Sequence, residues 1–600
     1  MNDEIQPALA NARAVLLAER NDAGHWEGEL STSALSTATA LVALGEVDRI
    51  LHEREIEAAC RWLIENRNGD GGWGDTVESY SNISTTLLCW SALSRFGGER
   101  AGVAVREASY WIRDYVGSLD PQLIAETVKA RYGKDRTFSV PILMLCAICG
   151  TLGGNGWSHV LRLPYELSIF PRDWFAAMRL PVVSYALPAL IAIGRAKDCQ
   201  TWRGNPAWPR ASKLLREIQP ASGGFLEAAP LTSFVTMALV AAGEKDHPVA
   251  KNGVRFLLET VRPDGSWPID TNLATWATTL AVKALGEGNQ PCLVDGPTGL
   301  DTGLNRVESS SVLDWLLGQQ YTEVHPFTNT PPGGWAWTDL TGGVPDADDT
   351  PGALLALAKL RTPDRESEML AAAEAAIVWL LDLQNRDGGI PTFCRGWGAL
   401  PFDRSSPDLT AHTLRAWHEW GPEMPDAVSR RIESGRKDAL SYLREQQRSD
   451  GSWVPLWFGN QYRFKDEENP TYGTSMVVRA LDDIGLPEMA DRGATWLISN
   501  QNADGGWGSG SGTPSSIEET SLALAALAFR REAEEAVVRG VGWLLDATGN
   551  GTEFEAAPIG FYFARLWYFE RIYPIVWTVE ALGRVSAGIL CHQQGKETVA

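Results

Sequence analysis

Three carboxylates lie within four residues of the chain, in the segment Asp346-Ala347-Asp348-Asp349. Pro351 suits the first position of a helix and Thr350 can cap it, so we expect the cluster in a loop at a helix N-terminus. Because like charges this close do not all ionise easily, at least one carboxyl is expected to keep its proton near neutral pH. Facing an apolar cavity, such a group is a Brønsted acid. On spacing alone, an ordinary acidic helix cap explains the same residues.

Length, composition and charge restrict the class of protein that carries this cluster. The 600 residues suffice for two or more domains, and 44% hydrophobic with 21% charged residues is typical of a globular protein. The net charge of -22 argues against a nucleic-acid partner, because nothing would neutralise phosphates. The N-terminus lacks a signal-peptide pattern, and the longest nearly apolar run, 180–193, is too short to span a bilayer. We therefore predict a cytoplasmic protein.

The elements that must position the cluster are indicated by an internal repeat. A helical aromatic–aliphatic stretch leads into an Asp-Gly turn, usually followed by Trp, and then into another apolar helix. Helix pairs recurring at about 50 residues, with hardly any strand-like alternation, predict an all-α fold of helical toroids. The Gly/Pro/Asn-rich stretch 286–305 is the expected boundary, dividing the chain into 1–295 and 296–600. The repeats occur at 59–73, 253–267, 376–389, 439–453 and 493–507.

Three features together resemble the class II terpene cyclases of the squalene–hopene cyclase family. They are the aromatic–Gln–Asp-Gly-x-Trp repeat, the Asp-x-Asp-Asp-Thr motif at 346–350, and the segment Pro407-Asp408-Leu409-Thr410-Ala411-His412. The resemblance implies two α/α barrels with a large apolar cavity between them, an arrangement that allows the N-terminal helix to pack with the C-terminal barrel.

The same resemblance implies a role for each polar residue. Asp348 would protonate a terminal alkene and start a carbocationic ring-closing cascade, with Asp346 and Asp349 holding it through hydrogen bonds. His412, steadied by Asp408, would bond to Asp348 and orient its proton. The acidic neighbours favour the proton on Asp348, whereas the helix N-terminus and a cationic His412 favour the anion after transfer.

A carbocation in a dry cavity needs stabilisation that offers no base, and aromatic faces provide it. The resemblance makes Trp337 the first candidate, and the hydroxyl of Tyr472 a route for returning the proton. Near Phe561 the chain departs from the family's Gly-Phe-Pro-Gly segment, so cavity aromatics there are expected to be shifted. More than half of the 25 tryptophans are expected to be packing residues. The other predicted substrate contacts are Trp335, Trp276, Trp457, Phe393, Cys394, Tyr562 and Phe569.

Three alternatives compete with a cyclase of squalene or a close relative. A class II cyclase of a prenyl diphosphate would need a basic or magnesium-binding site, and the sequence contains no cluster to supply one. A protein prenyltransferase β-subunit would need a zinc set of Asp, Cys and His. A toroid that only binds lipid would leave the acid cluster and His412 unexplained. We predict no cofactor and no metal.

An apolar polyprenoid partner would have to be collected from lipid, which predicts one-sided, peripheral membrane contact. The stretch from 165 to 221 mixes prolines, aromatic and basic residues, and a buried packing segment explains it equally well. A homodimer is also compatible with the sequence. The candidate contact residues are Trp174, Phe175, Met178, Trp202 and Trp208.

Overall fold

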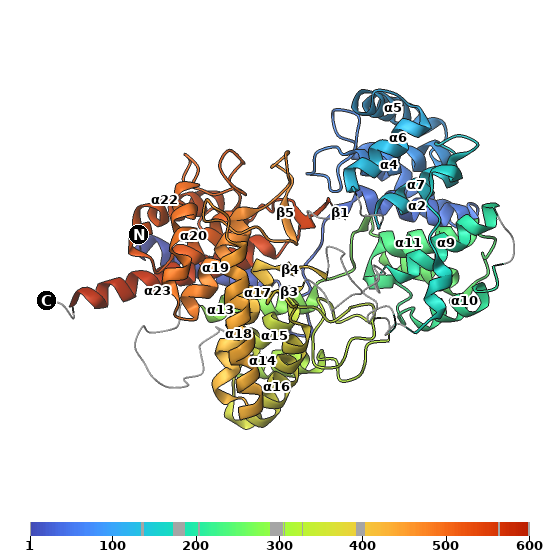
Figure 1. The fold of residues 1–600 in the computed structure, drawn as a ribbon. Coiled ribbons are helices and arrows are strands. Elements are labelled where there is room, and N and C mark those ends of the chain that lie inside the picture. The colour runs from blue at the N-terminus through green and yellow to red at the C-terminus, as the bar shows by residue number, and fades with distance from the viewer. Residues whose placement is uncertain are drawn as a thin grey trace.

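The computed structural model describes residues 2–133, 137–171, 174, 186–201, 205–287, 304, 306–326, 328–391, 403–561 and 565–597. Within these residues the chain forms two helical lobes (Figure 1). The predicted boundary stretch 286–305 lies largely outside the described residues. The helices of the N-terminal lobe are α2 (Ala34–Asp48), α3 (Glu53–Glu65), α4 (Ile83–Phe96), α5 (Gly102–Val116), α6 (Pro121–Tyr132), α7 (Ser139–Cys149), α9 (Leu187–Thr201), α10 (Trp208–Glu217), α11 (Ala229–Ala241) and α12 (Pro248–Thr260).

The C-terminal lobe contains a closed ring of inner helices. Each inner helix packs against the next, and the last, α23, returns to the first, α13. A second set of helices covers this ring from outside. The inner helices are α13 (Ala274–Gly286), α15 (Asp349–Lys359), α17 (Pro407–Trp420), α19 (Pro470–Asp483), α21 (Ile517–Leu527) and α23 (Tyr573–Glu597). The outer helices are α1 (Asn2–Ala18), α14 (Arg306–Gly318), α16 (Glu366–Leu383), α18 (Asp426–Gln446), α20 (Pro487–Ser499) and α22 (Glu534–Ala547).

Helices α1 and α13 precede residue 295 yet pack in the C-terminal lobe. Helix α1 contacts α22 and α23, and α13 contacts α15 and α23. The N-terminal lobe has its own inner ring, in which α2, α4, α7, α9 and α11 pack in succession and α11 closes on α2. The prediction of an all-α fold of two helical toroids is therefore confirmed.

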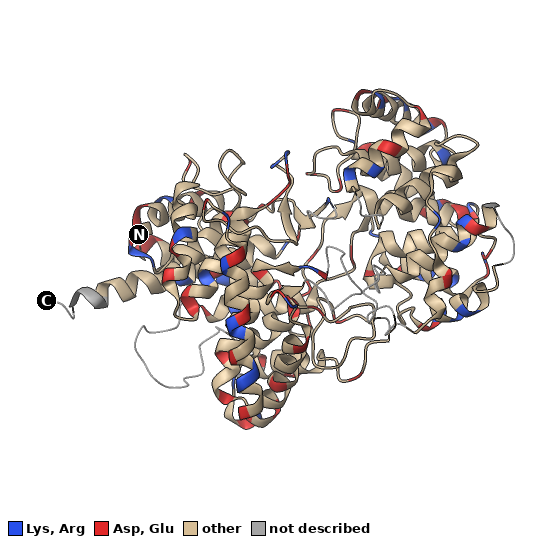
Figure 2. Ribbon diagram, viewed as in Figure 1, with Lys and Arg blue, Asp and Glu red and all other residues tan. Residues whose placement is uncertain are grey.

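Sequence pattern separates inner from outer helices. All thirteen residues of α13 and all eleven of α21 are buried, as expected for a helix surrounded by others. In α20 only positions 490, 493, 494, 496 and 497 are buried, which is the spacing of a single apolar stripe. Figure 2 shows acidic and basic residues along outer helices such as α16 and α18.

The repeats that carry a tryptophan after the Asp-Gly turn close through the same three contacts. In the repeat 59–73, Asp70 accepts a hydrogen bond from Gly72 N (3.0 Å) across the turn, and Gly71 has the positive φ of +91° that such a turn requires. The indole Nε1 of Trp73 donates to Leu63 O (2.8 Å), and its backbone N donates to Thr86 Oγ1 (3.0 Å). Equivalent indole-to-carbonyl bonds join Trp267 to Leu257, Trp453 to Leu443 and Trp507 to Leu497.

Short strands connect distant loops at the helix N-termini. Strand β1 (Thr32–Ser33) pairs with β2 (Trp267–Pro268), and β3 (Ile390–Pro391) pairs with β4 (Ser405–Ser406). A three-stranded antiparallel sheet joins β5 (Phe458–Asn460), β6 (Ile559–Phe561) and β7 (Leu566–Tyr568) in that order. This sheet brings residues about a hundred positions apart in sequence to one place.

Among the residues that the structure describes, one helix is long and apolar enough to cross a membrane, namely the Tyr573–Gln593 part of α23. In the structure 83% of its most apolar window is buried inside the C-terminal lobe. It therefore packs as a core helix.

Candidate active site

The acid cluster forms the N-terminus of inner helix α15. Asp346 Oδ1 accepts hydrogen bonds from the backbone N of Asp348 and of Asp349, each 2.8 Å long, so Asp346 caps the helix. The predicted cap, Thr350, is instead inside the helix, because its hydroxyl accepts the backbone N–H of Trp335 (3.0 Å) as in the other repeats. The helix therefore begins earlier than the position of Pro351 suggests.

Asp348 differs from its two acidic neighbours in exposure. Its side chain is 17% exposed, whereas Asp346 and Asp349 are buried. Asp348 Oδ1 lies 3.1 Å from His412 Nδ1, on the neighbouring inner helix α17. The structure thus brings Asp348 and His412 together as predicted from the sequence, although they are 64 residues apart.

Burial favours the protonated form of two members of the cluster, Asp348 and Asp349. Desolvation raises the pKa of Asp348 well above its ordinary value, and the charges of Asp346 and Asp408 raise it further. Desolvation likewise raises the pKa of Asp349, with the Asp346 carboxyl next. The pKa of Asp346 is raised to about 6, also by burial, although hydrogen bonds from Asp349 and two backbone N–H groups oppose the rise. Asp348 is therefore a protonated carboxyl with access to open space.

Two expectations about His412 need correction. Burial and the positive charges of Lys283 and Arg415 lower the pKa of His412 well below its ordinary value, so the imidazole is neutral rather than cationic. Asp408 does not steady the ring either. In the described part of the chain its carboxylate accepts from Ser406 Oγ, while His412 Nε2 is buried without a partner. Asp408 acts on Asp348 through its charge.

An aromatic group near the acid joins two inner helices, α19 and α13, through strand β5. The ring of Tyr472, on α19, lies 4.5 Å from that of Phe458, which is stacked at 6.3 Å on Trp276 of α13. All three side chains are buried. Burial raises the pKa of Tyr472, and the carboxyls of Asp348 and Asp408 add to the rise, which places this hydroxyl near the acid.

A second aromatic chain crosses the sheet. Trp457 meets Phe561 edge to face at 4.5 Å, and Phe561 lies 5.5 Å from Tyr568. The hydroxyl of Tyr573 accepts from Trp276 Nε1 (2.8 Å) and lies 3.1 Å from the Tyr568 hydroxyl, which joins the two chains. Sequence reasoning did not identify the roles of Phe458, Tyr568 and Tyr573. The only signal was the aromatic density of 457–458 and 560–569.

The paired tryptophans before the acid have different environments. Trp337 is partly exposed, and its indole lies beside the buried Asp270 carboxyl. Trp335 is completely buried, and its Nε1 donates to Leu316 O (2.8 Å), the bond made by the turn tryptophans of other repeats. The prediction that Trp335 contacts substrate is therefore wrong, because its ring faces no open space. Phe569, which follows Tyr568, is partly exposed; its carbonyl accepts from Ser31 N (2.8 Å) and its backbone N donates to Ser31 Oγ (3.1 Å).

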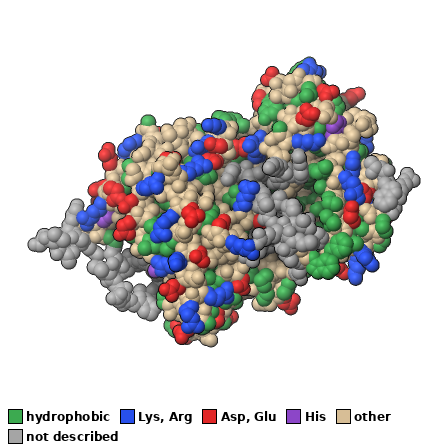
Figure 3. All heavy atoms as spheres, viewed as in Figure 1, with side chains coloured by type: hydrophobic (Ala, Val, Ile, Leu, Met, Phe, Trp, Pro, Cys, Tyr) green, Lys and Arg blue, Asp and Glu red, His purple; other side chains and the backbone are tan. Residues whose placement is uncertain are grey.

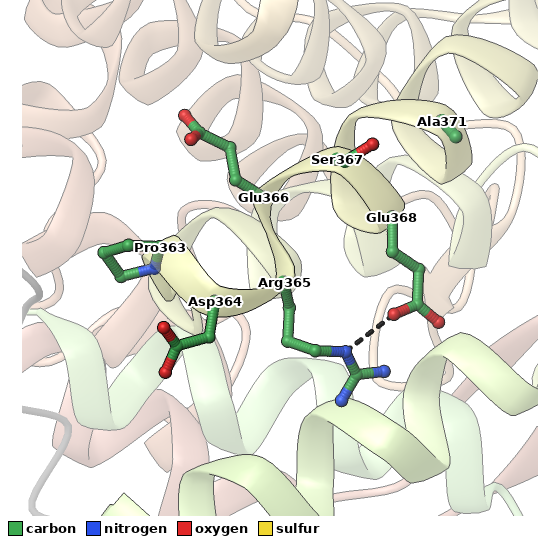
Figure 4. Close-up of a pocket in the computed structure, with 7 residues that line it drawn as sticks. All are labelled: Pro363, Asp364, Arg365, Glu366, Ser367, Glu368 and Ala371. Carbon is green, nitrogen blue, oxygen red and sulfur yellow. Dashed lines mark hydrogen bonds and ion pairs between the residues drawn. The ribbon is translucent and has the colours of Figure 1, made fainter.

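Three predicted contacts, Phe393, Cys394 and Tyr562, lie outside the described residues. Within the described chain, no group of three or more His, Cys, Asp or Glu side chains could hold a metal ion. A surface hollow lies at the start of α16, away from the acid cluster (Figure 4). Within it Arg365 pairs with Glu368, with 2.6 Å between Nε and Oε2. It is lined by Pro363, Asp364, Arg365, Glu366, Ser367, Glu368 and Ala371.

Comparison with known proteins agrees with this geometry. Residues 9–191 match the squalene-hopene cyclase N-terminal domain, and residues 272–587, more than half of the chain, match the C-terminal domain. The chain belongs to the squalene–hopene cyclase family. The C-terminal match contains the acid cluster, His412, Tyr472 and both aromatic chains.

Individual members of the squalene–hopene cyclase family are distant in sequence. A terpene cyclase-glycosyl transferase fusion protein of Humicola fuscoatra is 27% identical over 643 residues, covering 91% of this chain and 47% of the relative. A squalene–hopene cyclase of Zymomonas mobilis is 24% identical over 637 residues, covering 91% and 89%. The chain spans about half the length of the first two curated relatives that it matches. The ent-copalyl diphosphate synthase of Streptomyces platensis shares the fold, with a TM-score of 0.56, 18% identity, and coverage of 97% and 99%.

Proposed function

We propose that this member of the squalene–hopene cyclase family cyclises a linear polyprenoid, squalene or a close relative, by protonating its terminal alkene. One observation carries the proposal. Asp348 is a protonated carboxyl that reaches open space within an otherwise buried acid cluster and lies beside an aromatic group. An alkene is a weak base, so its protonation needs a positioned acid in a site where water does not compete for the proton.

The first step transfers one proton and leaves one negative charge on the protein. The Asp348 O–H bond breaks, its hydrogen bonds to the terminal alkene carbon, and the alkene electron pair forms that C–H bond. The conjugate base is stabilised by the α15 N-terminus and by the hydrogen bond to His412, whose Nδ1–H donates to the carboxylate in one of its two neutral tautomers. The neutral state of His412 means that it orients the acid without being a stronger acid itself.

Partly exposed aromatic side chains suit the second step, in which each ring closure moves the positive charge along the substrate. Faces of Trp337, Trp457 and Phe561 are partly exposed, so they can lie against a cation. Ring quadrupoles stabilise a cation by about 2 kcal/mol or more in a desolvated site and offer no lone pair that would end the cascade. The hydroxyls of Tyr472 and Tyr568 are candidates for returning a proton to Asp348, because the Asp348 carboxylate is close enough to raise the pKa of each.

The squalene arm of the test uses purified protein and detergent-dispersed squalene, with products identified by gas chromatography and mass spectrometry. A new polycyclic product that is absent with the Asp348→Asn variant supports the proposal. A second arm supplies geranylgeranyl and farnesyl diphosphate. Cyclisation of a diphosphate alone would replace the substrate assignment and keep the acid mechanism. Binding of polyprenoids with no product in either arm would favour a lipid-binding toroid.

We also propose peripheral contact with a membrane, through the N-terminal lobe. Phe170 and Trp174 are 46% and 57% exposed, and their rings stack at 6.2 Å. Figure 3 shows hydrophobic side chains gathered on the visible face of this lobe. Trp208, another candidate, packs within the lobe between Arg195 and Tyr165. Of the remaining candidates, Phe175, Met178 and Trp202 lie outside the described residues.

A further inference from the structure

A layer of buried and half-buried charged side chains lies in the inner ring, about two to three helical turns below the acid. Three arginines and three carboxylates on α13, α17, α19 and α23 or at their ends pair within it. Arg479 Nη1 lies 2.6 Å from Glu580, and Arg479 Nη2 lies 3.1 Å from Glu287. Asp483 receives two of the arginines at 2.9 and 2.8 Å. With Lys283, we call this set the ionic layer: Lys283, Glu287, Arg415, Arg479, Asp483, Glu580 and Arg584.

Lys283 is the member of the ionic layer that has no ion pair. It is 6% exposed, and among the described residues no carboxylate oxygen lies within 4.0 Å of its ammonium group. The three arginines and three carboxylates balance one another, so Lys283 leaves the layer with one positive charge in excess. A buried charge without a counter-ion is costly to folding. A functional reason for keeping it is therefore expected.

Helix packing directs Lys283 toward the acid. Gly352 N donates to Asp348 O (3.1 Å), so Gly352 lies one turn below Asp348. A Cβ at Gly352 would lie 3.2 Å from Thr279 Oγ1 and 3.7 Å from His412 Cε1, so α13, α15 and α17 meet at this level. Lys283 follows Thr279 by one turn on α13, and helical side chains lean toward the N-terminus of their helix. Its ammonium therefore reaches back toward the level of Gly352.

We propose that Lys283 is a positioning residue for the acid, supplying the positive charge that balances the Asp348 carboxylate after its proton has gone to substrate. This inference rests on the proposed function. Before transfer, a neutral Asp348 leaves the lysine charge unmatched. After transfer, the carboxylate and the ammonium balance, so the charge favours the product side of the protonation step. The lysine thus makes Asp348 a stronger acid without touching the substrate.

The electrostatic surroundings agree with this direction. Lys283 lowers the pKa of Asp348 against the effects of burial, Asp346 and Asp408. Burial lowers the pKa of Lys283 itself to about 8, so it is mostly protonated at neutral pH. The charged groups that face Lys283 are Glu580 on α23, Arg415 on α17, Asp348 on α15 and Arg479 on α19. Those that face Asp348 include His412 on α17 and Tyr472 on α19, both neutral at pH 7.

The test measures the protonation of Asp348 in the protein alone. Infrared titration of the carboxyl stretch, with Asp348→Asn as the reference, gives the pH midpoint of this group. Lys283→Met removes the charge at nearly constant volume, so the midpoint is expected to rise by about one pH unit or more. Lys283→Arg keeps the charge and is expected to restore it. Lys359→Met, which removes a partly exposed charge from the last turn of α15, is the matched control and should leave the midpoint unchanged.

Stability and turnover separate the proposal from a structural role. Because Lys283→Met removes an unpaired buried charge, its melting temperature should stay the same or rise. On the substrate found for the wild type, kcat should fall about three- to tenfold with KM unchanged, because the acid is weaker. An unchanged midpoint, or a lower melting temperature without a midpoint shift, overturns the proposal. The infrared readout needs no substrate, so failure of the wild type to cyclise polyprenoids would reject the proposed function and leave the result on Lys283 standing.

Discussion

Replacing Asp348 by asparagine removes a single acidic proton from the site and changes little else. The amide has nearly the shape of the carboxyl, and because burial keeps Asp348 protonated, a neutral group replaces a neutral group. The free energy of unfolding should therefore change by no more than about 1 kcal/mol, as for a substitution that leaves the packing and hydrogen bonding nearly intact. The fold and the binding of substrate are expected to survive.

The effect on turnover should be far larger. A positioned general acid contributes about 10²–10⁴-fold, which corresponds to about 2.7–5.4 kcal/mol of transition-state stabilisation. No neighbour can take over, because Asp346 is tied to two backbone N–H groups and Asp349 is buried beneath it. Product formation from saturating substrate, followed by mass spectrometry at pH 6–7, should fall at least a hundredfold in Asp348→Asn.

The matched control is Asp349→Asn, one residue further along the same helix. Asp349 is protonated and hydrogen-bonded to Asp346, and an amide can donate in its place. Its turnover should fall tenfold or less. Equal losses of turnover in the two variants would mean that the cluster acts only as a structural unit. If the Asp348→Asn enzyme kept more than a tenth of wild-type turnover, Asp348 would not be the acid.

Three further predictions follow from the same geometry. Trp337→Ala should release partly cyclised products, because losing about 2 kcal/mol of cation–π stabilisation shifts the partitioning between further ring closure and early proton loss more than tenfold. Gas chromatography of the product mixture checks this, and an unchanged mixture would make Trp337 a packing residue. Burial raises the pKa of both Glu518 and Glu570 to about 8, so the stability they contribute is complete below the unfolded pKa of about 4.3 and is lost as pH rises toward 8. Melting temperature should therefore fall from pH 5 to 8, less steeply in Glu518→Gln, and a flat profile in the wild type would contradict this assignment. Wild-type protein should float with liposomes at low and high salt, and a Phe170→Ala/Trp174→Ala double variant should float less; equal flotation of the two proteins would locate membrane contact elsewhere.

The sequence was a good guide wherever a feature depends on local chain chemistry. Each repeat has its own Asp-Gly turn, usually followed by a tryptophan, so the succession of helix pairs could be predicted from one unit at a time. The pairing of Asp348 with His412 followed from the family motif. The start of α15 was misplaced because Pro351 and Thr350 are good local signals, whereas the helix is capped earlier, by the carboxylate of Asp346.

Features created by ring closure or by distant strand pairing had no local signal. Tyr568 and Tyr573 join the aromatic group only because β7 pairs with β6 and α23 closes the ring on α13. The low pKa of His412 depends on its burial and on the charge of Lys283, which lies on another helix, α13, as well as on Arg415 of its own helix. Trp335 was grouped with Trp337 by sequence proximity, yet the two indoles have unlike surroundings.

The repeat also explains why acid chemistry arises at this end of the C-terminal ring. In five successive inner helices a threonine near the helix N-terminus accepts, through its hydroxyl, a backbone N–H from an earlier loop of the chain. The residue two positions before that threonine lies at the helix N-terminus. Because the inner helices are equivalent, these N-termini gather at one end of the ring, where their dipoles favour negative charge while burial opposes it. Asp348 keeps its proton there, because burial and the charges of Asp346 and Asp408 raise its pKa, while the helix N-terminus stabilises its conjugate base; a proton donor to an alkene requires this balance. The chemistry at this end of the ring therefore differs with the side chain at one repeat position, which in order from α13 to α21 is occupied by Trp276, Asp348, Asp408, Tyr472 and Glu518.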